Sequence, residues 1–305
     1  MSNIGHAPSA VVMIRPHQFV TNPQTSGDNA FQQVPSDPNA IKALAYQQVT
    51  DVAELLMRKG VEVILFEDET DLTPDSVFPN NWFTTHNDGA LCVYPMYPEN
   101  RRLERRQDVL DKLINDYQVN YFINYSHFES QHQFLEGTGA MVLDHANRIA
   151  YAVRSHRCSE QVFNLFCRQH NFQGVLFDAS DNLGNPIYHT NVLMCVASDF
   201  VMISDEMIRD TKQRAMVVNA IQASGKQLIS LTESQINQYA GNALELQGKD
   251  KKYLALSTTA QGCLTDDQRN TISSHVTLLP CDVTALEYAG GSIRCMLAGI
   301  HLHKK

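Results

Sequence analysis

The stretch NAIKALAYQQVTDVAELLMRKGVEVILF, residues 39–66, contains the alternation that decides the fold class. Its first part, residues 39–59, places apolar side chains on one helical stripe, at Ile41, Leu44, Val52, Leu55 and Leu56. Gly60 is a typical helix stop, and the run 61–66 that follows is rich in β-branched residues. The stretch therefore predicts a helix followed directly by a strand, as in an α/β protein.

The same alternation continues through the rest of the chain. Four further helices are expected to begin near Arg101, Ser159, Glu206 and Thr265, the last with a capping box from Thr265 to Gln268. Besides 61–66, strands are expected at 10–15, 90–94, 121–124, 140–144, 148–153, 174–177, 191–196, 200–204, 253–257 and 292–300. The helix starts lie roughly 50–60 residues apart, and such regular spacing indicates a repeated strand-and-helix unit.

Composition limits the function classes. The 305 residues include 24 basic and 33 acidic ones, a net charge of −9, and 43% are hydrophobic. This apolar content excludes a disordered chain, and the negative charge argues against a nucleic-acid partner because phosphate would be repelled. No apolar run reaches the roughly 20 residues of a membrane helix. Because no secretory leader is visible either, we expect a cytoplasmic protein. The length suits two domains or one large domain, and since no linker is visible we expect one domain over residues 1–305.

The seven cysteines are an odd number, so a disulfide framework would leave one unpaired. No CxxC pair and no zinc-finger spacing of Cys and His occurs, which argues against structural zinc. The nucleotide and metalloprotease motifs GxGxxG, Walker A and HExxH are missing as well. We therefore expect neither a metal nor an organic cofactor.

The stretch AGGSIRCM, residues 289–296, places Cys295 shortly after two glycines and directly after Arg294. The glycine pair permits a tight turn beside the sulfur. A neighbouring cation favours the thiolate, which is the nucleophilic form. Cys295 is therefore a candidate nucleophile, although a buried cysteine in a final strand would fit the same sequence.

Two more stretches carry candidate acid and base groups. IYHTNVLM, residues 187–194, places His189 at the mouth of an expected strand, where an imidazole can exchange protons near neutral pH. FLEGTGAM, residues 134–141, places Glu136 between apolar residues and a glycine turn. A carboxylate in that setting needs a partner, such as an imidazole that it orients. Each residue alone also fits an ordinary structural role.

The stretch DSVFPNNWF, residues 75–83, contains the only tryptophan. Aromatic residues flank its Pro-Asn-Asn turn, so a flat ligand could stack on Phe78 and meet the side-chain amide of Asn81. Proline and asparagine are also common turn formers, and a plain β-turn is the alternative interpretation.

Together, in this order and spacing, the four stretches resemble the guanidino-group-modifying enzymes of the pentein superfamily, such as arginine deiminases and dimethylarginine hydrolases. The resemblance covers essentially the whole chain and is closest to the amidinotransferase group also called citrulline-utilisation hydrolases. It implies an α/β fold, a five-bladed α/β-propeller with pseudo-fivefold repeats, which fits the five expected helices. It also implies that Cys295 is the nucleophile, that His189 is the general acid/base, and that Glu136 matches the Glu-Gly motif of the catalytic site.

Two positions depart from that family. Where deiminases hold the guanidinium with aspartates, this sequence has Asn81 and Asn191. A carboxylate suits a cation, whereas an amide offers one donor and one acceptor and so matches a neutral ureido group. The departure favours ureido hydrolysis, or a dihydrolase, over plain arginine deimination.

The implied reaction is attack of Cys295 on the guanidino or ureido carbon of an arginine- or citrulline-type amino acid, through a covalent intermediate. The substrate head would stack on Phe78 and meet Asn81, Asn191 and Glu136. Arg294 and Arg157 are candidates for binding the substrate carboxylate, with Arg154 as a rival. The arginines at 101, 102, 105 and 106 are expected on a solvated helix face.

Three functions remain open. A hydrolase comes first, an amidinotransferase with the same three catalytic residues second, and a catalytically silent binding protein third. The expected partner is a small guanidino or ureido amino acid, and a homodimer is possible only by analogy with the family.

Overall fold

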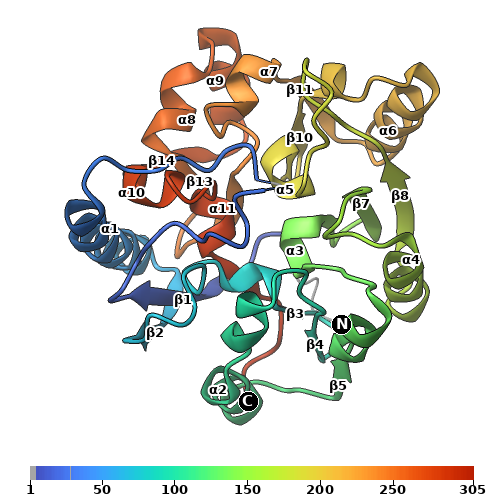
Figure 1. Cartoon of the computed structure of the whole chain (residues 1–305). Coiled ribbons are helices and arrows are strands. Elements are labelled where there is room, and N and C mark those ends of the chain that lie inside the picture. The colour runs from blue at the N-terminus through green and yellow to red at the C-terminus, as the bar shows by residue number, and fades with distance from the viewer. Residues whose placement is uncertain (1–4, 28) are drawn as a thin grey trace.

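The computed structural model describes residues 5–27 and 29–305. In these residues the strands form five sheets of three strands each, and Figure 1 shows the sheets distributed around a common centre. In every sheet the middle strand is antiparallel to the first strand of the order and parallel to the last. The five sheets are therefore five copies of one unit.

The sheets, each with its strands in hydrogen-bonding order, are β15 (Ala298–Ile300), β1 (Ala10–Pro16) and β2 (Glu62–Asp68); β3 (Phe83–Thr85), β4 (Ala90–Val93) and β5 (Tyr121–Asn124); β6 (Met141–Asp144), β7 (Ile149–Val153) and β8 (Gln173–Phe177); β9 (Met194–Val196), β10 (Phe200–Ile203) and β11 (Gln227–Ser230); and β12 (Leu244–Gln247), β13 (Lys252–Ser257) and β14 (Thr277–Cys281). The first sheet joins both ends of the chain, since β15 pairs with β1.

A helical connection joins the two parallel strands of each unit, and Figure 1 shows these helices at the periphery. They are α1 (Pro38–Arg58), α2 (Gln107–Asp116), α4 (Glu160–Gln169), α6 (Thr211–Ala223), and the pair α8 (Thr258–Cys263) and α9 (Asp266–Ser273). The short helices are α3 (Gly137–Ala140), α5 (Thr190–Leu193), α7 (Glu233–Ile236), α10 (Thr284–Glu287) and α11 (Ile293–Met296), with 3-10 turns η1 (Pro79–Asn81), η2 (Asn100–Glu104), η3 (Ser126–Gln131) and η4 (Asp205–Met207).

Local sequence explains the long helices. Asp37 caps α1 by accepting hydrogen bonds from the backbone N–H groups of Asn39 and Ala40. The side chains buried along α1 recur at helical spacing and cover the strand β1. The predicted capping box of α9 is confirmed, because Thr265 accepts from the N–H of Gln268 and the Gln268 side chain bonds back.

Several predicted boundaries are wrong. The helices expected from Arg101 and Glu206 begin at Gln107 and Thr211, because the 3-10 turns η2 and η4 come first. The runs 191–196 and 292–300 are not continuous strands, since each opens with a one-turn helix, α5 or α11. The sequence analysis also missed the strands β3, β11, β12 and β14. None of the helices in the described part of the chain is long and apolar enough to span a bilayer.

A one-turn segment precedes the first strand of four units: η1 before β3, α3 before β6, α5 before β9 and α11 before β15. Figure 1 shows α3, α5 and α11 near the centre of the molecule. The backbones of α3 and η1 pack closely, and Gly137 (φ +43°) is required because a Cβ there would lie 2.5 Å from the carbonyl oxygen of Asn80 in η1. The central region is therefore where residues from different units meet.

Candidate active site

Cys295 lies in the one-turn helix α11 and is buried. Its Sγ accepts two hydrogen bonds, from Nδ2 of Asn191 and from Nδ2 of Asn242, each 3.2 Å long. The amide of Asn242 is itself fixed, because its Oδ1 accepts from the backbone N–H of Arg294. The sulfur thus has two amide donors beside it, a setting that stabilises negative charge on a thiolate.

The glycine pair before Cys295 has a packing role. A Cβ on Gly291 would lie 2.5 Å from the Phe78 ring, so only glycine lets this ring approach. Gly290 adopts φ +77°, and its carbonyl accepts a hydrogen bond from the hydroxyl of Tyr188. The turn thereby brings Phe78 and Tyr188 beside Cys295.

His189 and Glu136 form a buried pair at the ends of two one-turn helices. Oε2 of Glu136 lies 2.8 Å from Nε2 of His189, and Oε1 accepts from the backbone N–H of Tyr97. Burial alone would raise the pKa of Glu136, but Arg157, His189 and Arg101 lower it to about 2. Because an ionised carboxylate only accepts, Nε2 of His189 carries the proton and Nδ1 is left as the acceptor.

Burial also decides the charge of the imidazole. Desolvation lowers the pKa of His189 to about 4, although Glu136 partly opposes the change. His189 is therefore neutral at physiological pH and able to accept a proton through Nδ1.

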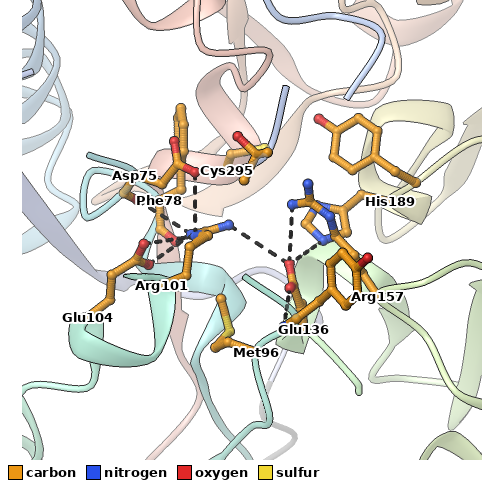
Figure 2. A network of polar contacts seen from close by, with 12 residues as sticks. Asp75, Phe78, Met96, Arg101, Glu104, Glu136, Arg157, His189 and Cys295 are labelled. Atoms are coloured by element: carbon orange, nitrogen blue, oxygen red, sulfur yellow. Dashed lines mark hydrogen bonds and ion pairs between the residues drawn. The ribbon is translucent and has the colours of Figure 1, made fainter. Parts of the chain in front are cut away.

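Figure 2 shows Glu136 between two arginines, with Arg101 on one side and Arg157 on the other. The guanidinium of Arg157 lies 3.5 Å from Oε2 of Glu136 and stacks over the Tyr188 ring at 4.9 Å. Arg101 lies 3.8 Å from the same carboxylate and bonds both oxygens of Glu104 at 2.8 Å. The two arginines hold Glu136 ionised and fixed in place.

The placement of Arg101 corrects the sequence analysis, which put it on a solvated helix face. Arg101 is 2% exposed and faces the pocket, held by its ion pair with Glu104 and by Asp75 at 3.6 Å. Burial raises the pKa of Glu104 to about 7, with Arg101 opposing that rise. The local sequence did not reveal this role, because the basic pairs around residue 101 resemble an exposed helix.

Asp75 is a second residue that the sequence analysis passed over. Its Oδ2 accepts from Nδ2 of Asn22 at 2.8 Å, whereas its buried Oδ1 has no hydrogen-bond partner within the protein. Asn81 lies nearby, and with its amide oxygen turned toward Arg101 it accepts a hydrogen bond of 2.7 Å. A carboxylate is therefore present in the pocket even though both family aspartate positions are asparagines.

One small pocket joins these groups. Its volume is about 20 Å³, and it is lined by Asn29, Asp75, Phe78, Asn81, Arg101, Arg157, Tyr188, His189, Ala289, Gly290, Gly291 and Cys295. Cys295 and His189 thus line the same pocket. Glu136 does not line it, but contacts His189 through the hydrogen bond to Nε2. The three come from α11 and from the residues that precede α5 and α3.

Of the candidate residues from the sequence, five line this pocket: Phe78, Asn81, Arg157, His189 and Cys295. Glu136 and Asn191 reach it through the hydrogen bonds to His189 and Cys295. Asn242 was missed, and no local motif marks it.

Two candidate arginines lie elsewhere. The Arg294 side chain donates to the carbonyl of Leu297 and lines a different cavity, together with His6, Glu245 and His301. Arg154 is at the surface, where it pairs with Glu160 and Asp178. Neither guanidinium lines the pocket of Cys295.

The described residues contain one group of His, Cys, Asp or Glu side chains able to hold a metal ion: His86, Cys92 and His170. None of the three lines the Cys295 pocket.

Comparisons with known proteins agree with this architecture. Residues 15–302 match the family model described as "N,N dimethylarginine dimethylhydrolase, eukaryotic". No curated protein sequence gives a significant match.

Three solved structures are similar in fold. The substrate-bound N-terminal domain of ArgZ, described as an arginine dihydrolase from the ornithine-ammonia cycle in Cyanobacteria, has a TM-score of 0.72 at 15% identity, over 95% of this chain and 97% of that one. A mutant of AgrE in complex with L-arginine has a TM-score of 0.73 at 15% sequence identity, and the match covers 95% of this chain and 40% of that one. A dimethylarginine dimethylaminohydrolase adduct with S-methyl-L-thiocitrulline has a TM-score of 0.63 at 12% sequence identity, and the match covers 96% of this chain and 100% of that one.

At such low identities these structures establish the shared fold alone. The family model spans nearly the whole chain, so the chain belongs to the N,N dimethylarginine dimethylhydrolase family of the guanidino-modifying pentein superfamily.

Proposed function

We propose that the chain is a cysteine-dependent hydrolase that cleaves a C–N bond at the guanidino or ureido carbon of an arginine- or citrulline-type amino acid. The observation that carries the proposal is the common pocket of Cys295 and His189, with Glu136 hydrogen-bonded to His189 at 2.8 Å. A nucleophile, a base and a group that orients the base are the parts that covalent catalysis needs.

The proposed substrate head lies flat against Phe78, beside the sulfur. Two buried acceptors support it there, since Oδ1 of Asp75 and Oδ1 of Asn191 have no hydrogen-bond partner within the protein. Both suit N–H groups of a guanidinium, and the Asp75 carboxylate adds opposite charge. This carboxylate favours a cationic guanidino substrate over a neutral ureido one, contrary to the preference drawn from Asn81 and Asn191 alone.

In the proposed first step, Nδ1 of His189 takes the thiol proton of Cys295 while the sulfur forms a bond to the guanidino carbon. His189 then donates this proton to the departing nitrogen, and the C–N bond breaks to release ammonia, or an alkylamine from a methylated arginine. The amides of Asn191 and Asn242 hold the sulfur toward the carbon during the attack.

In the second step a water attacks the same carbon. His189 accepts a proton from this water, the C–S bond breaks, and the thiol regains a proton. Glu136 stabilises the imidazolium formed in each step, as a buried carboxylate beside the ring does in other covalent hydrolases. No metal or organic cofactor enters these steps.

The substrate carboxylate is assigned to Arg157, which lines the pocket and is held over Tyr188. A planar guanidinium suits a carboxylate through two parallel hydrogen bonds. Arg294 is not part of this proposal, because it lines a different cavity.

At the scale of the chain, we propose that the five units form a five-bladed α/β-propeller and that residues 1–305 act as one catalytic domain in the cytoplasm. The five like sheets around a common centre support this arrangement.

The test is ammonia or amine release from arginine, methylarginines, agmatine, citrulline and succinylarginine, with products identified by mass. Cys295→Ser is expected to abolish release, and Cys281→Ser, which changes another buried thiol, is expected to keep it. Unchanged release by Cys295→Ser contradicts the proposal. Labelled arginine with glycine or ornithine gives an amidino-transfer product only if the chain is a transferase, and binding of every compound without turnover indicates a silent protein.

A further inference from the structure

A second set of chemically active side chains lies outside the pocket. His86 directly follows β3, Cys92 belongs to β4, and His170 ends α4 in the neighbouring unit. All three are buried, and one potential ligand atom from each lies within 4.8 Å of the others. The set therefore joins the sheet β3-β4-β5 to the helix α4 of the neighbouring unit.

The spacing within this set suits a tetrahedral ion. Sγ of Cys92 lies 3.5 Å from Nε2 of His170. Zn–S and Zn–N bonds of about 2.3 and 2.0–2.1 Å at a tetrahedral angle separate their two donor atoms by about 3.5 Å. The hydroxyl of Tyr125 lies 3.2 Å from the same nitrogen and offers an oxygen at the fourth position.

His86 carries an independent indication. Its ring is fully buried and its Nε2 is 2.8 Å from the hydroxyl of Thr84, but its Nδ1 has no hydrogen-bond partner within the protein. Buried polar atoms nearly always have a partner, and a missing one calls for an explanation such as a bound ion.

We propose that His86, Cys92 and His170 bind one zinc ion, with Tyr125 or a water as the fourth ligand. Two imidazoles and a thiolate favour zinc over magnesium or calcium, which prefer oxygen ligands. Binding replaces the thiol proton of Cys92, which passes to solvent. The ion cross-links the sheet β3-β4-β5 to the unit of α4, so its role is structural and separate from the reaction at Cys295.

Sequence spacing could not indicate this site, because its ligands lie 6 and 78 residues apart along the chain. Zinc-finger spacing describes sites built within one short segment, whereas here the fold brings the ligands together.

The experiment measures zinc in untagged full-length protein after dialysis against Zn²⁺, in a Cys295→Ser background that removes the active-site thiol. We expect one zinc per chain and a higher melting temperature with zinc than without. Adding Cys92→Ala is expected to lower zinc affinity by at least ~10-fold. Adding Cys158→Ala, which changes another buried thiol of the same core cluster, is expected to leave both readings unchanged.

Absence of stoichiometric zinc, or zinc binding that Cys92→Ala leaves intact, overturns the proposal. If Cys92→Ala fails to fold, Co²⁺ added to the Cys295→Ser protein provides the second test. Thiolate-to-cobalt charge-transfer absorption with tetrahedral ligand-field bands is expected, and a spectrum without thiolate bands contradicts the site.

Discussion

At the scale of single residues, the site depends on one buried carboxylate with three cationic or polar neighbours. Glu136 contacts His189, Arg101 and Arg157, and is fully buried. Removing its charge leaves two buried guanidinium groups with less compensation, which is more costly than losing a surface pair.

Glu136→Gln is therefore expected to lower the free energy of unfolding by about 3–5 kcal/mol. It is also expected to reduce kcat by ~10²–10⁴-fold, because His189 loses the group that orients and stabilises it. Urea unfolding and steady-state kinetics measure the two effects. Glu67→Gln is the control, since Glu67 pairs with Arg15 at the surface and its loss costs about 1 kcal/mol or less. Equal losses in the two variants contradict the assigned role of Glu136.

Asp75 decides between charged and neutral substrates in this account. Asp75→Asn is expected to lower kcat/KM for arginine by ~10–100-fold, the size of one charged hydrogen bond, and to change that for citrulline much less. Asp68→Asn is the matched control, because Asp68 is a buried aspartate that bonds Thr70 and Thr73 outside the pocket. A uniform loss for both substrates means that Asp75 does not contact the cationic head.

At the scale of elements, one-turn helices place the reactive groups. In four of the five units such a one-turn segment precedes the first strand, and Gly139 in α3 lets α3 approach Asn81 and His189. A Cβ at Gly139 would collide with the Asn81 amide and lie 2.9 Å from Cε1 and Nδ1 of His189.

Gly139→Ala is therefore expected to displace His189 and to lower kcat by ~10–100-fold, since misplacements of about 1 Å have effects of that order. Gly262→Ala tests whether any added methyl group would do the same. No atom lies within 4 Å of a Cβ at Gly262 in α8, so activity should remain and stability should rise by ~0.4–1 kcal/mol. Full activity in Gly139→Ala contradicts the close packing described here.

Elements whose signals lie in neighbouring residues could be predicted from the sequence, whereas elements whose conformation depends on tertiary packing could not. The stripe of α1 and the capping box at Thr265 depend on neighbours along the chain, and both are confirmed. The run 191–196 looked like a strand because it is rich in apolar and β-branched residues, but its first turn is helical where α5 packs against α3. The short edge strand Gln227–Ser230 contains too few apolar residues to be predicted from its sequence.

At the scale of the whole molecule, the order of motifs predicted the pentein fold, and Cys295, His189 and Glu136 lie together around one pocket. The arginines could not be assigned in the same way. Arg101 is buried and Arg154 exposed, although both lie in similarly polar sequence. Arg101 is buried because Glu104, Asp75 and Glu136 surround it in the folded chain, whereas Arg154 meets its two carboxylates at the surface. The sequence alone does not show which of the two surroundings a guanidinium will have.

Acid sensitivity is a property of the whole fold. Outside the proposed zinc site, burial lowers the pKa of His6 and His145, of His189 to about 4 and of His301 to about 3. These histidines stay neutral in the folded chain while the unfolded chain gains protons below about pH 6.5, so their contribution to stability is lost as the pH falls from there toward 4 and 3.

Glu136, with its pKa lowered to about 2, extends this loss from about pH 4.5 downward. Glu104 acts in the opposite direction, because its pKa is raised to about 7 in the folded chain. Its contribution to folding stability is present at low pH and is lost as the pH rises through that value. The four histidines outnumber Glu104, and we expect the melting temperature to fall between pH 6.5 and 4. A melting temperature that stays constant over this range contradicts the neutral histidine core.

The most direct test of the central claim uses His189→Gly at alkaline pH, with S-methyl-L-thiocitrulline as the probe. Solvent can then take the thiol proton of Cys295 in place of His189, and methanethiol can leave without a proton from His189, whereas hydrolysis of the intermediate, which needs His189 as the base, should be blocked. Attack by Cys295 expels methanethiol and leaves the rest of the probe on the sulfur. The mass of the intact protein is expected to rise by the mass of the probe minus the mass of methanethiol. Peptide mapping is expected to find this added mass on the peptide that contains Cys295. Cys281→Ser in the same background should keep this adduct. An unchanged mass, or an adduct that persists in Cys295→Ser, would contradict the account.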